Sequence, residues 1–131
     1  MATLIRRGRI ANPSRPEAGE VLRLAPGDDP ARVADRLGSA ARVEVNFPSF
    51  TDGRGYSIAR LLRERHGYQG ELRAVGDVQR DQLFYLARCG FDAFLLRDGL
   101  DAEESLRALQ DFSEAYQASV ERPEPLFRRR G

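Results

Sequence analysis

Apolar residues along this chain follow two different spacings, which alternate from one segment to the next. Short runs with the period of a strand recur between stretches whose apolar residues lie three or four positions apart, the period of a helix. Prolines and glycines separate the two kinds of segment. The pattern predicts strands at residues 21–24, 43–47, 72–75 and 91–96, and helices at 30–37, 58–66, 78–89 and from 102 onward.

Residues that favour the N-cap position precede three of the expected helices. Asp29 stands before Pro30, and proline suits the first position of a helix. Asp77 is placed to cap the third helix through its carboxylate. Asp101 begins the last and longest helix, with Glu104 three residues later in the spacing of a capping box.

Four strand–helix units in succession predict an α/β fold with a parallel sheet and right-handed crossovers. The repeat leaves two architectures open, a half-barrel and an open sheet. A half-barrel leaves strand edges bare, which favours pairing with a second copy of the chain as a homodimer. We expect residues 20–119 to form a single domain. Residues 1–19 are expected to be an irregular arm, or a hairpin around Arg7-Gly8, and residues 120–131 an Arg- and Pro-rich tail.

The charged residues exclude several classes of protein. All 21 basic residues are arginine, and 20 acidic residues bring the net charge to +1. Without lysine the chain has no catalytic amine, and without a basic surplus it has no global field to hold nucleic acid. The single Cys89 and single His66 exclude a disulfide framework and a zinc site built by one chain. We expect no metal and no cofactor.

Hydrophobic content also limits where the protein works. No apolar run approaches the roughly 20 residues that cross a bilayer, and the basic start of the chain lacks an apolar core. We therefore expect a cytoplasmic protein without membrane contact. Cys89, at the end of the third helix on a mostly apolar face, is expected to be a buried structural thiol. Arg60, Arg63 and Arg65 are expected to form the solvated face of the second helix.

The segment that follows the second strand is the first candidate for a binding site. In parallel α/β folds, ligands bind at the carboxyl ends of the strands, where the loops lead into the helices. Gly53 and Gly55 allow the backbone to approach an anion, Arg54 adds a forked donor, and Ser57 adds a hydroxyl. The alternative is a plain strand-to-helix turn in which Asp52 caps the helix, Arg54 is solvated and Ser57 serves as a cap.

Two further loops at the same edge carry arginines. Arg80 lies in the first turn of the third helix, where a cation opposes the helix dipole. It therefore either pairs with Asp77 or Asp81 or faces an anionic ligand. Arg97, directly after the fourth strand, is a third arm of the same charged site. The candidate anion-binding residues are Asp52, Gly53, Arg54, Gly55, Ser57, Arg80 and Arg97, and the candidate catalytic carboxylates are Asp52 and Asp77.

Five stretches of the chain match motifs of a known family; they are residues 47–65, which include TDGRGYSIARLLRER, and residues 70–78, 80–83, 88–94 and 111–117. Together they resemble an uncharacterised bacterial family associated with assimilatory sulfite reductase, whose members are often labelled oxidoreductases. Members are commonly encoded near sulfite reductase and phosphoadenylylsulfate reductase. The resemblance implies a role in sulfur assimilation, with sulfite reductase or another enzyme of that pathway as a partner. It carries over no catalytic residue.

The residues themselves do not fit an independent redox enzyme. Pro26-Gly27 stands where a dinucleotide-binding glycine motif would open the first unit, and no cysteine set exists for an iron–sulfur cluster. The leading hypothesis is an accessory α/β protein that binds a small oxyanion and docks on a reductase. The alternative is a small enzyme of sulfur assimilation that uses Asp52 or Asp77 as acid or base and the arginines as oxyanion clamps. A third reading is a structural oligomer without ligand, whose loop arginines all pair internally.

Overall fold

The structure is a computed structural model that describes residues 3–12, 19–49, 53–97, 99–107 and 109–110. Within these residues the chain is a mixed α/β fold built on one six-stranded sheet. The strand order is β2-β1-β6-β5-β4-β3. The strands are β1 (Thr3–Arg6), β2 (Arg9–Ala11), β3 (Glu20–Leu24), β4 (Ala40–Phe47), β5 (Glu71–Gly76) and β6 (Ala93–Leu96).

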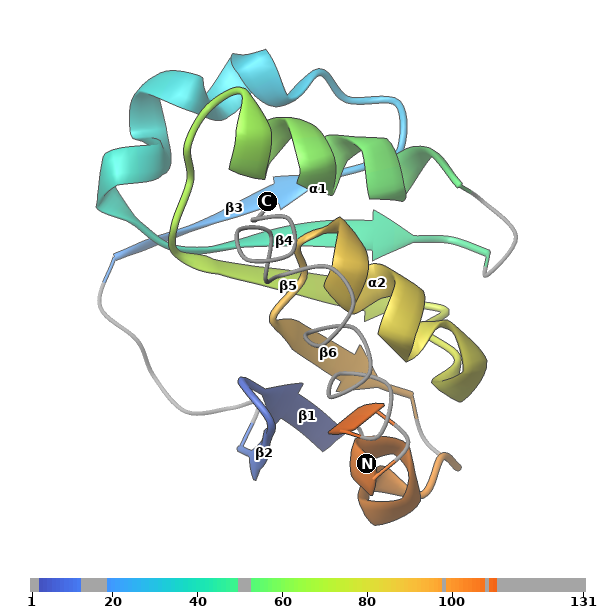
Figure 1. Cartoon of the computed structure of the whole chain (residues 1–131). Coiled ribbons are helices and arrows are strands. Elements are labelled where there is room, and N and C mark those ends of the chain that lie inside the picture. Colours follow the sequence, from blue (N-terminus) through green and yellow to red (C-terminus); the bar gives the residue numbers. More distant parts are fainter. Residues whose placement is uncertain (1–2, 13–18, 50–52, 98, 108, 111–131) are drawn as a thin grey trace, which may run out of the picture.

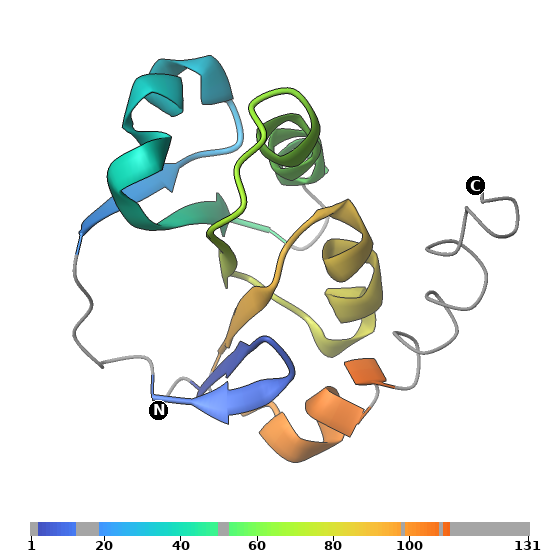
Figure 2. The same cartoon turned by 60° about the vertical axis from the view of Figure 1, so that its left-hand side comes forward.

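Four of the strands, from β3 to β6, run parallel and lie side by side in chain order. The segments between them form helices on one side of the sheet, as both views show (Figures 1 and 2). These helices are η1 (Pro30–Ser39), α1 (Arg54–Glu64), η2 (Arg80–Gln82) and α2 (Leu83–Cys89). Residues 102–107 and 109–110, after β6, are also helical. The four predicted strands are therefore confirmed, and the sheet is mostly parallel.

The core lies between the sheet and these helices. Alternate residues of each strand, such as Val43 and Val45 of β4, point toward the helices and are fully buried. Ile58 and Leu62 of α1 meet them, because residues four apart share one face of a helix. Cys89 is free and 2% exposed in this core, so the expectation of a buried thiol is confirmed.

The beginning of the chain is not the irregular arm that one reading of the sequence predicted. β1 and β2 form a hairpin whose two turn residues, Arg7 and Gly8, have φ angles of 52° and 80°. Such positive φ values are those of the tight two-residue turn that suits paired strands. β1 then pairs antiparallel with β6, with Ile5 opposite Phe94. The hairpin therefore covers the β6 edge that a half-barrel would leave bare, and the sheet is open, with β2 and β3 at its edges.

Two helices differ from the sequence-based expectation, so four equivalent strand–helix units are not confirmed in the described residues. Asp29 caps the first helix by accepting from the N–H of Ala31 at 3.0 Å, as predicted, but the helix is 3-10 rather than α. Gly38 and Ser39 at its end are weak α-helix formers. The third helix is divided into η2 and α2, because Gln79 and Gln82 form a capping box around a 3-10 turn before the α-helix begins. No helix within the described residues has the length and apolar character needed to cross a bilayer.

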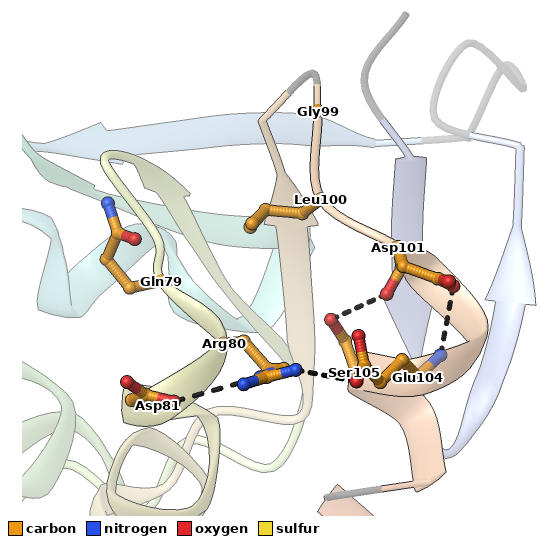
Figure 3. A pocket seen from close by; sticks show the side chains of 8 residues that line it. All are labelled: Gln79, Arg80, Asp81, Gly99, Leu100, Asp101, Glu104 and Ser105. Carbon is orange, nitrogen blue, oxygen red and sulfur yellow. Dashed lines mark hydrogen bonds and ion pairs between the residues drawn. The ribbon is translucent and has the colours of Figure 1, made fainter.

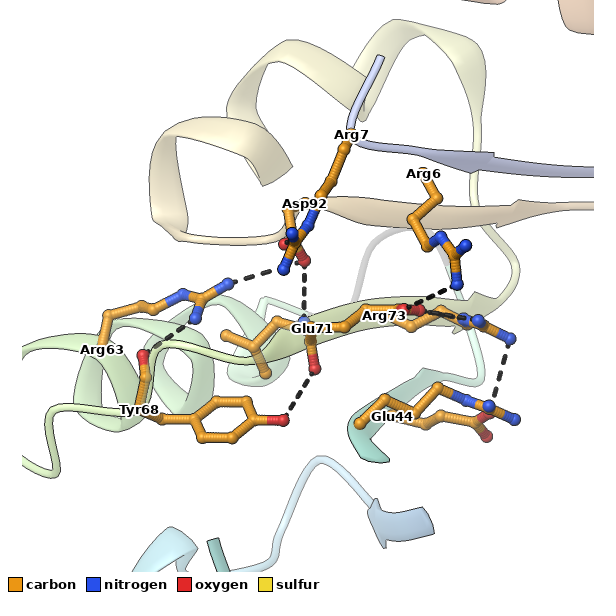
Figure 4. A network of polar contacts seen from close by, with 10 residues as sticks. Arg6, Arg7, Glu44, Arg63, Tyr68, Glu71, Arg73 and Asp92 are labelled. Atoms are coloured by element: carbon orange, nitrogen blue, oxygen red, sulfur yellow. Dashed lines mark hydrogen bonds and ion pairs between the residues drawn. The ribbon is translucent and has the colours of Figure 1, made fainter. Parts of the chain in front are cut away.

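The other face of the sheet carries no described helix and is charged (Figures 2 and 4). The strand register places one residue of each strand in a continuous cross-strand row. In order from β2 to β3 this row consists of Arg9, Arg6, Ala93, Arg73, Glu44 and Arg23. Glu71, two residues before Arg73, accepts from Arg73 Nε at 2.7 Å and lies 3.5 Å from Arg6 Nη1. We call this set of six positions the arginine row.

Candidate functional site: a polar cluster at the carboxyl edge

The chain turns into the candidate site at Gly76, the last residue of β5. Gly76 has φ +95°, and a Cβ there would lie 2.5 Å from the carbonyl oxygen of Phe47 on β4. Only glycine fits both the backbone angle and this close approach. The next residue, Asp77, donates its N–H to the same Phe47 oxygen at 2.7 Å. Gly76 and Phe47 thus fix where the Asp77 carboxylate lies.

Asp77 meets a residue from the neighbouring strand at this edge. Gln79 Nε2 donates to Asp77 Oδ1 at 2.6 Å, and Arg97 Nη1 lies 3.7 Å from the same oxygen. Arg97 Nη2 also donates to Gln79 Oε1 at 3.5 Å. We call Asp77, Gln79 and Arg97 the edge cluster. With Asp81 and Gln82 it lines a depression of about 610 Å³.

The prediction that Asp77 caps the third helix is wrong. The N-cap of η2 is Gln79, whose backbone N–H donates to Gln82 Oε1 at 3.4 Å. Asp77 lies two residues earlier, and its carboxylate is occupied by Gln79 and Arg97. Asp77 does precede the helix, as the sequence pattern indicates. The backbone bend at Gly76, however, turns the Asp77 side chain toward β6.

Arg80 lies in an adjoining depression of about 300 Å³ (Figure 3). Its Nη1 is 2.9 Å from Glu104 Oε2, and its Nε is 3.7 Å from Asp81 Oδ1. Pairing with Asp81 was one of the two predicted explanations for a cation in this first turn. The shorter contact, to Glu104, was not predicted, because that residue was assigned to a capping box. Asp101 does cap the last helix, accepting from Glu104 N at 3.1 Å, while the Glu104 side chain points to Arg80 (Figure 3).

The predicted anion loop lies farther along the same edge. Gly53 is the N-cap of α1, and Arg54 is its first residue, with Nη1 3.8 Å from the place where a Gly27 Cβ would be. Gly55 is buried, and a Cβ there would lie 2.6 Å from the Phe47 ring, so this glycine is required for packing of α1 on β4. Ser57 is exposed inside α1 and is not a cap. Asp52 lies outside the described residues.

A tyrosine of α1 contacts Gln82, which lines the same depression as the edge cluster. Gln82 Nε2 donates to the Tyr56 hydroxyl oxygen at 3.2 Å, and the Tyr56 and Tyr85 rings meet edge to face at 4.8 Å between centroids. Burial, with smaller effects of Cys89 and Tyr85, raises the pKa of Tyr56 above its ordinary value of 10.0. Sequence reasoning missed four site residues: Tyr56, Gln79, Gln82 and Glu104. The contacts of Tyr56 with Gln82, of Gln79 with Arg97 and of Glu104 with Arg80 each join segments that are distant along the chain.

The raised pKa of Tyr56 predicts a loss of stability at alkaline pH. The unfolded chain releases this proton first as pH rises, so the contribution of Tyr56 is complete below about pH 10 and is lost above it. Replacing Tyr56 with phenylalanine should make the free energy of unfolding less dependent on pH in that range, as urea unfolding would measure. Burial also raises the pKa of Tyr68. An ultraviolet titration of Tyr56→Phe should therefore lose the late phenolate component of Tyr56 and keep that of Tyr68, and retention of both would contradict the assignment.

These features define an α/β protein with a single, mostly parallel sheet and a polar cluster at the carboxyl edge of its central strands. Residues 21–127, most of the chain, match the family described as Bacterial protein of unknown function (DUF934), and the chain belongs to this family. No curated protein and no solved structure matches the chain. The family match includes the whole edge cluster but only part of the sheet, since the β1–β2 hairpin precedes it.

Proposed function

We propose that this protein is an accessory α/β protein of assimilatory sulfate and sulfite reduction, which binds a small oxyanion and docks on a reductase of that pathway. The binding part is carried by one observation: Arg97, from the end of β6, meets Asp77 and Gln79, from the end of β5, beside a polar depression. The pathway part is supported by the resemblance of the sequence motifs to the family associated with sulfite reductase.

Arg97 is the arginine of this edge best suited to bind an anion. Its side chain is 54% exposed, and its contacts with Asp77 and Gln79, at 3.7 and 3.5 Å, are long. A guanidinium held in this way can turn its forked N–H groups to an oxyanion and form a bidentate contact. Arg80, held by Glu104 at 2.9 Å, contributes charge but stays with its partner.

Binding calorimetry with sulfite, sulfate and phosphate tests this proposal. Replacing Arg97 with glutamine should weaken oxyanion binding about tenfold or more, because a charge-assisted bidentate contact is lost. Arg65→Gln is the matched control: it removes the same charge from an exposed position after α1 and should leave affinity unchanged. Absence of oxyanion binding by the natural protein, or an equal effect of the two substitutions, would overturn the binding part.

A small enzyme of sulfur assimilation is the second candidate function, and the position of Asp77 favours it. The carboxylate is 25% exposed and lies beside a guanidinium at the edge of a depression, where it could exchange a proton with a bound oxyanion. Asp77→Asn separates the two readings. If the protein is an accessory binder, the substitution should strengthen oxyanion binding by removing a repelling charge, and co-purification with the reductase should survive. Loss of a measurable turnover by the purified protein would favour the enzyme.

The ligand-free reading receives partial support from the same contacts, since Arg80 and Arg97 both have acidic partners within the chain. It differs from the proposal in what it predicts for Arg97. A purely structural Arg97–Asp77 pair should respond to Arg97→Gln with a change in unfolding free energy and with no change in anion affinity. The two measurements, made on one variant, therefore decide between these readings.

A further inference from the structure

The turn of the β1–β2 hairpin lies at the amino end of β6, opposite the end that leads to the edge cluster, and the hairpin concentrates positive charge. Residues 3–12 contain three arginines, at positions 6, 7 and 9, and no acidic residue. Arg6 and Arg7 reach acids of other elements, Glu71 at 3.5 Å and Asp92 at 3.2 Å. Arg9 is exposed and has no hydrogen bond or ion pair from its side chain to any described residue. Among the described residues, one guanidinium of the hairpin is therefore without an acidic partner and can take an external carboxylate.

A hollow beside the hairpin is lined by the same arginines and could hold part of a bound ligand. It has a volume of about 480 Å³, and no acidic side chain of the described residues lines it. The lining residues are Arg6, Arg7, Arg9, Ile10, Ala11 and Asn12. Arg9 and Arg6 are also the first two members of the arginine row. Farther along the row, Arg73 is paired with Glu71 and Glu44, so the positive charge without an acidic partner among the described residues lies at the Arg9 end.

The hairpin also offers a free strand edge. β2 is the last strand of the sheet and pairs only with β1 among the described strands. In a two-residue hairpin the closing pair, here Arg6 and Arg9, is hydrogen-bonded, so the backbone N–H and C=O of the next residue point outward. That residue is Ile10, whose side chain is 44% exposed. An extended segment can therefore pair with Ile10 through its backbone and contact an apolar side chain.

These observations favour an acidic polypeptide over a nucleic acid. Residues 3–12 have no aromatic side chain on which a base could stack. The net charge of +1 gives no wide field for a phosphate backbone. A strand edge, an exposed isoleucine and a forked donor beside them suit a peptide that alternates acidic and apolar residues, because neighbouring side chains of a strand point to opposite faces.

We propose that the β1–β2 hairpin is a docking site for an acidic, extended segment of another protein, which adds to the free edge of β2 and places a carboxylate on Arg9. The site is separate from the edge cluster: Arg7 and Asp92 lie at the amino end of β6, and Arg97 follows its carboxyl end. A test of peptide binding at the hairpin is therefore independent of a test of oxyanion binding at the edge cluster.

Fluorescence anisotropy with a short labelled peptide of alternating glutamate and valine tests the docking site in the full chain. The natural protein should bind this peptide with an affinity that falls as salt is added, and should bind the glutamine-for-glutamate peptide more weakly. Arg9→Gln should weaken binding about fivefold or more, since a charge-assisted contact is removed. Arg65→Gln, the control with the same change in net charge, and Arg97→Gln should both leave peptide binding unchanged.

The remaining outcomes each overturn the proposal. Tighter binding of a labelled oligouridylate than of the acidic peptide would assign the hairpin to nucleic acid. Equal losses in Arg9→Gln and Arg65→Gln would show that overall charge, and not the hairpin, holds the peptide. No binding of the acidic peptide at low salt would remove the site. A circular dichroism spectrum identical to that of the natural protein checks that Arg9→Gln is folded, as expected for an exposed side chain.

Discussion

Replacing Arg73 with methionine is expected to lower the free energy of unfolding by about 3 kcal/mol or more, the cost of breaking a buried ion pair from one side. The Arg73 side chain is 3% exposed in the middle of the arginine row, and its Nε and Nη2 both lie 2.7 Å from Glu71 Oε2 (Figure 4). Its Nη1 is 4.0 Å from Glu44 Oε2. Methionine would leave both carboxylates in place, 7% and 12% exposed, without the cation between them.

A double substitution shows whether the loss comes from the stranded charge. Glu71→Gln added to Arg73→Met should recover part of the loss, because a neutral amide costs less to bury than a carboxylate that has lost its partner at 2.7 Å and keeps a longer contact with Arg6, at 3.5 Å. Arg23→Met is the control from the same row; its side chain is 71% exposed, and its pair with Glu44 should be worth about 1 kcal/mol or less. Urea unfolding measures all three. A single Arg73 variant as stable as the natural protein, or a double variant less stable than the single, would contradict this account.

The strands of this fold can be predicted from the sequence because their signal is local. Val43, Val45 and Phe47 alternate with polar residues, and the structure places them on the helix side of β4. The polar residues between them were predictable as the other face. What they do was not: Glu44 lies beside Arg73 and Arg23 only through the register of three strands. Register depends on contacts between distant segments, which spacing along the chain does not contain.

The same limit explains the hairpin and the site. The turn at Arg7-Gly8 was one of two predicted forms for the start of the chain, but its place beside β6 joins residues about ninety positions apart along the chain. At the carboxyl edge, the sequence rule for parallel sheets led to Asp77 and Arg97, and the structure brings these two side chains within 3.7 Å. It could not show that Glu104, from the last helix, would hold Arg80. Whether these residues bind an anion stays a prediction.

Arg63 shows how a helical pattern can assign a side chain to the wrong environment. Its neighbours Arg60 and Arg65 are exposed, as predicted for the solvated face of this helix. The Arg63 side chain is only 22% exposed and lies over the Tyr68 ring, 5.6 Å from its centroid. Burial lowers the pKa of Arg63 below its ordinary value. Gly90 leaves the space that this side chain fills, since a Cβ there would lie 2.7 Å from Arg63 Cγ.

Replacing Arg63 with alanine is therefore expected to lower the free energy of unfolding by about 3 kcal/mol, because three backbone carbonyls lose their donor in a partly buried position. Arg63 donates from Nε to Gly90 O at 2.9 Å, and from Nη1 to Tyr68 O and Gly70 O, both at 2.8 Å. Its Nη2 lies 3.6 Å from Asp92 Oδ1 (Figure 4). These contacts join the end of α1 to the segments that enter β5 and β6.

The Arg63→Lys substitution shows whether the Arg63 contacts depend on the shape of the guanidinium or on its positive charge. A lysine keeps the cation but carries its donors on one nitrogen, which cannot reach Gly90 O while also serving Tyr68 O and Gly70 O as the guanidinium does. Arg63→Lys should therefore recover less than half of the loss seen in Arg63→Ala, whereas Arg65→Ala, which removes an exposed side chain two residues later, should change stability by about 0.5 kcal/mol or less. Urea unfolding of the three variants makes the comparison. If Arg63→Lys were as stable as the natural protein, charge alone would matter at this position. If Arg63→Ala and Arg65→Ala lowered the free energy of unfolding equally, Arg63 would behave like a solvated residue of the helix, and this account would be wrong.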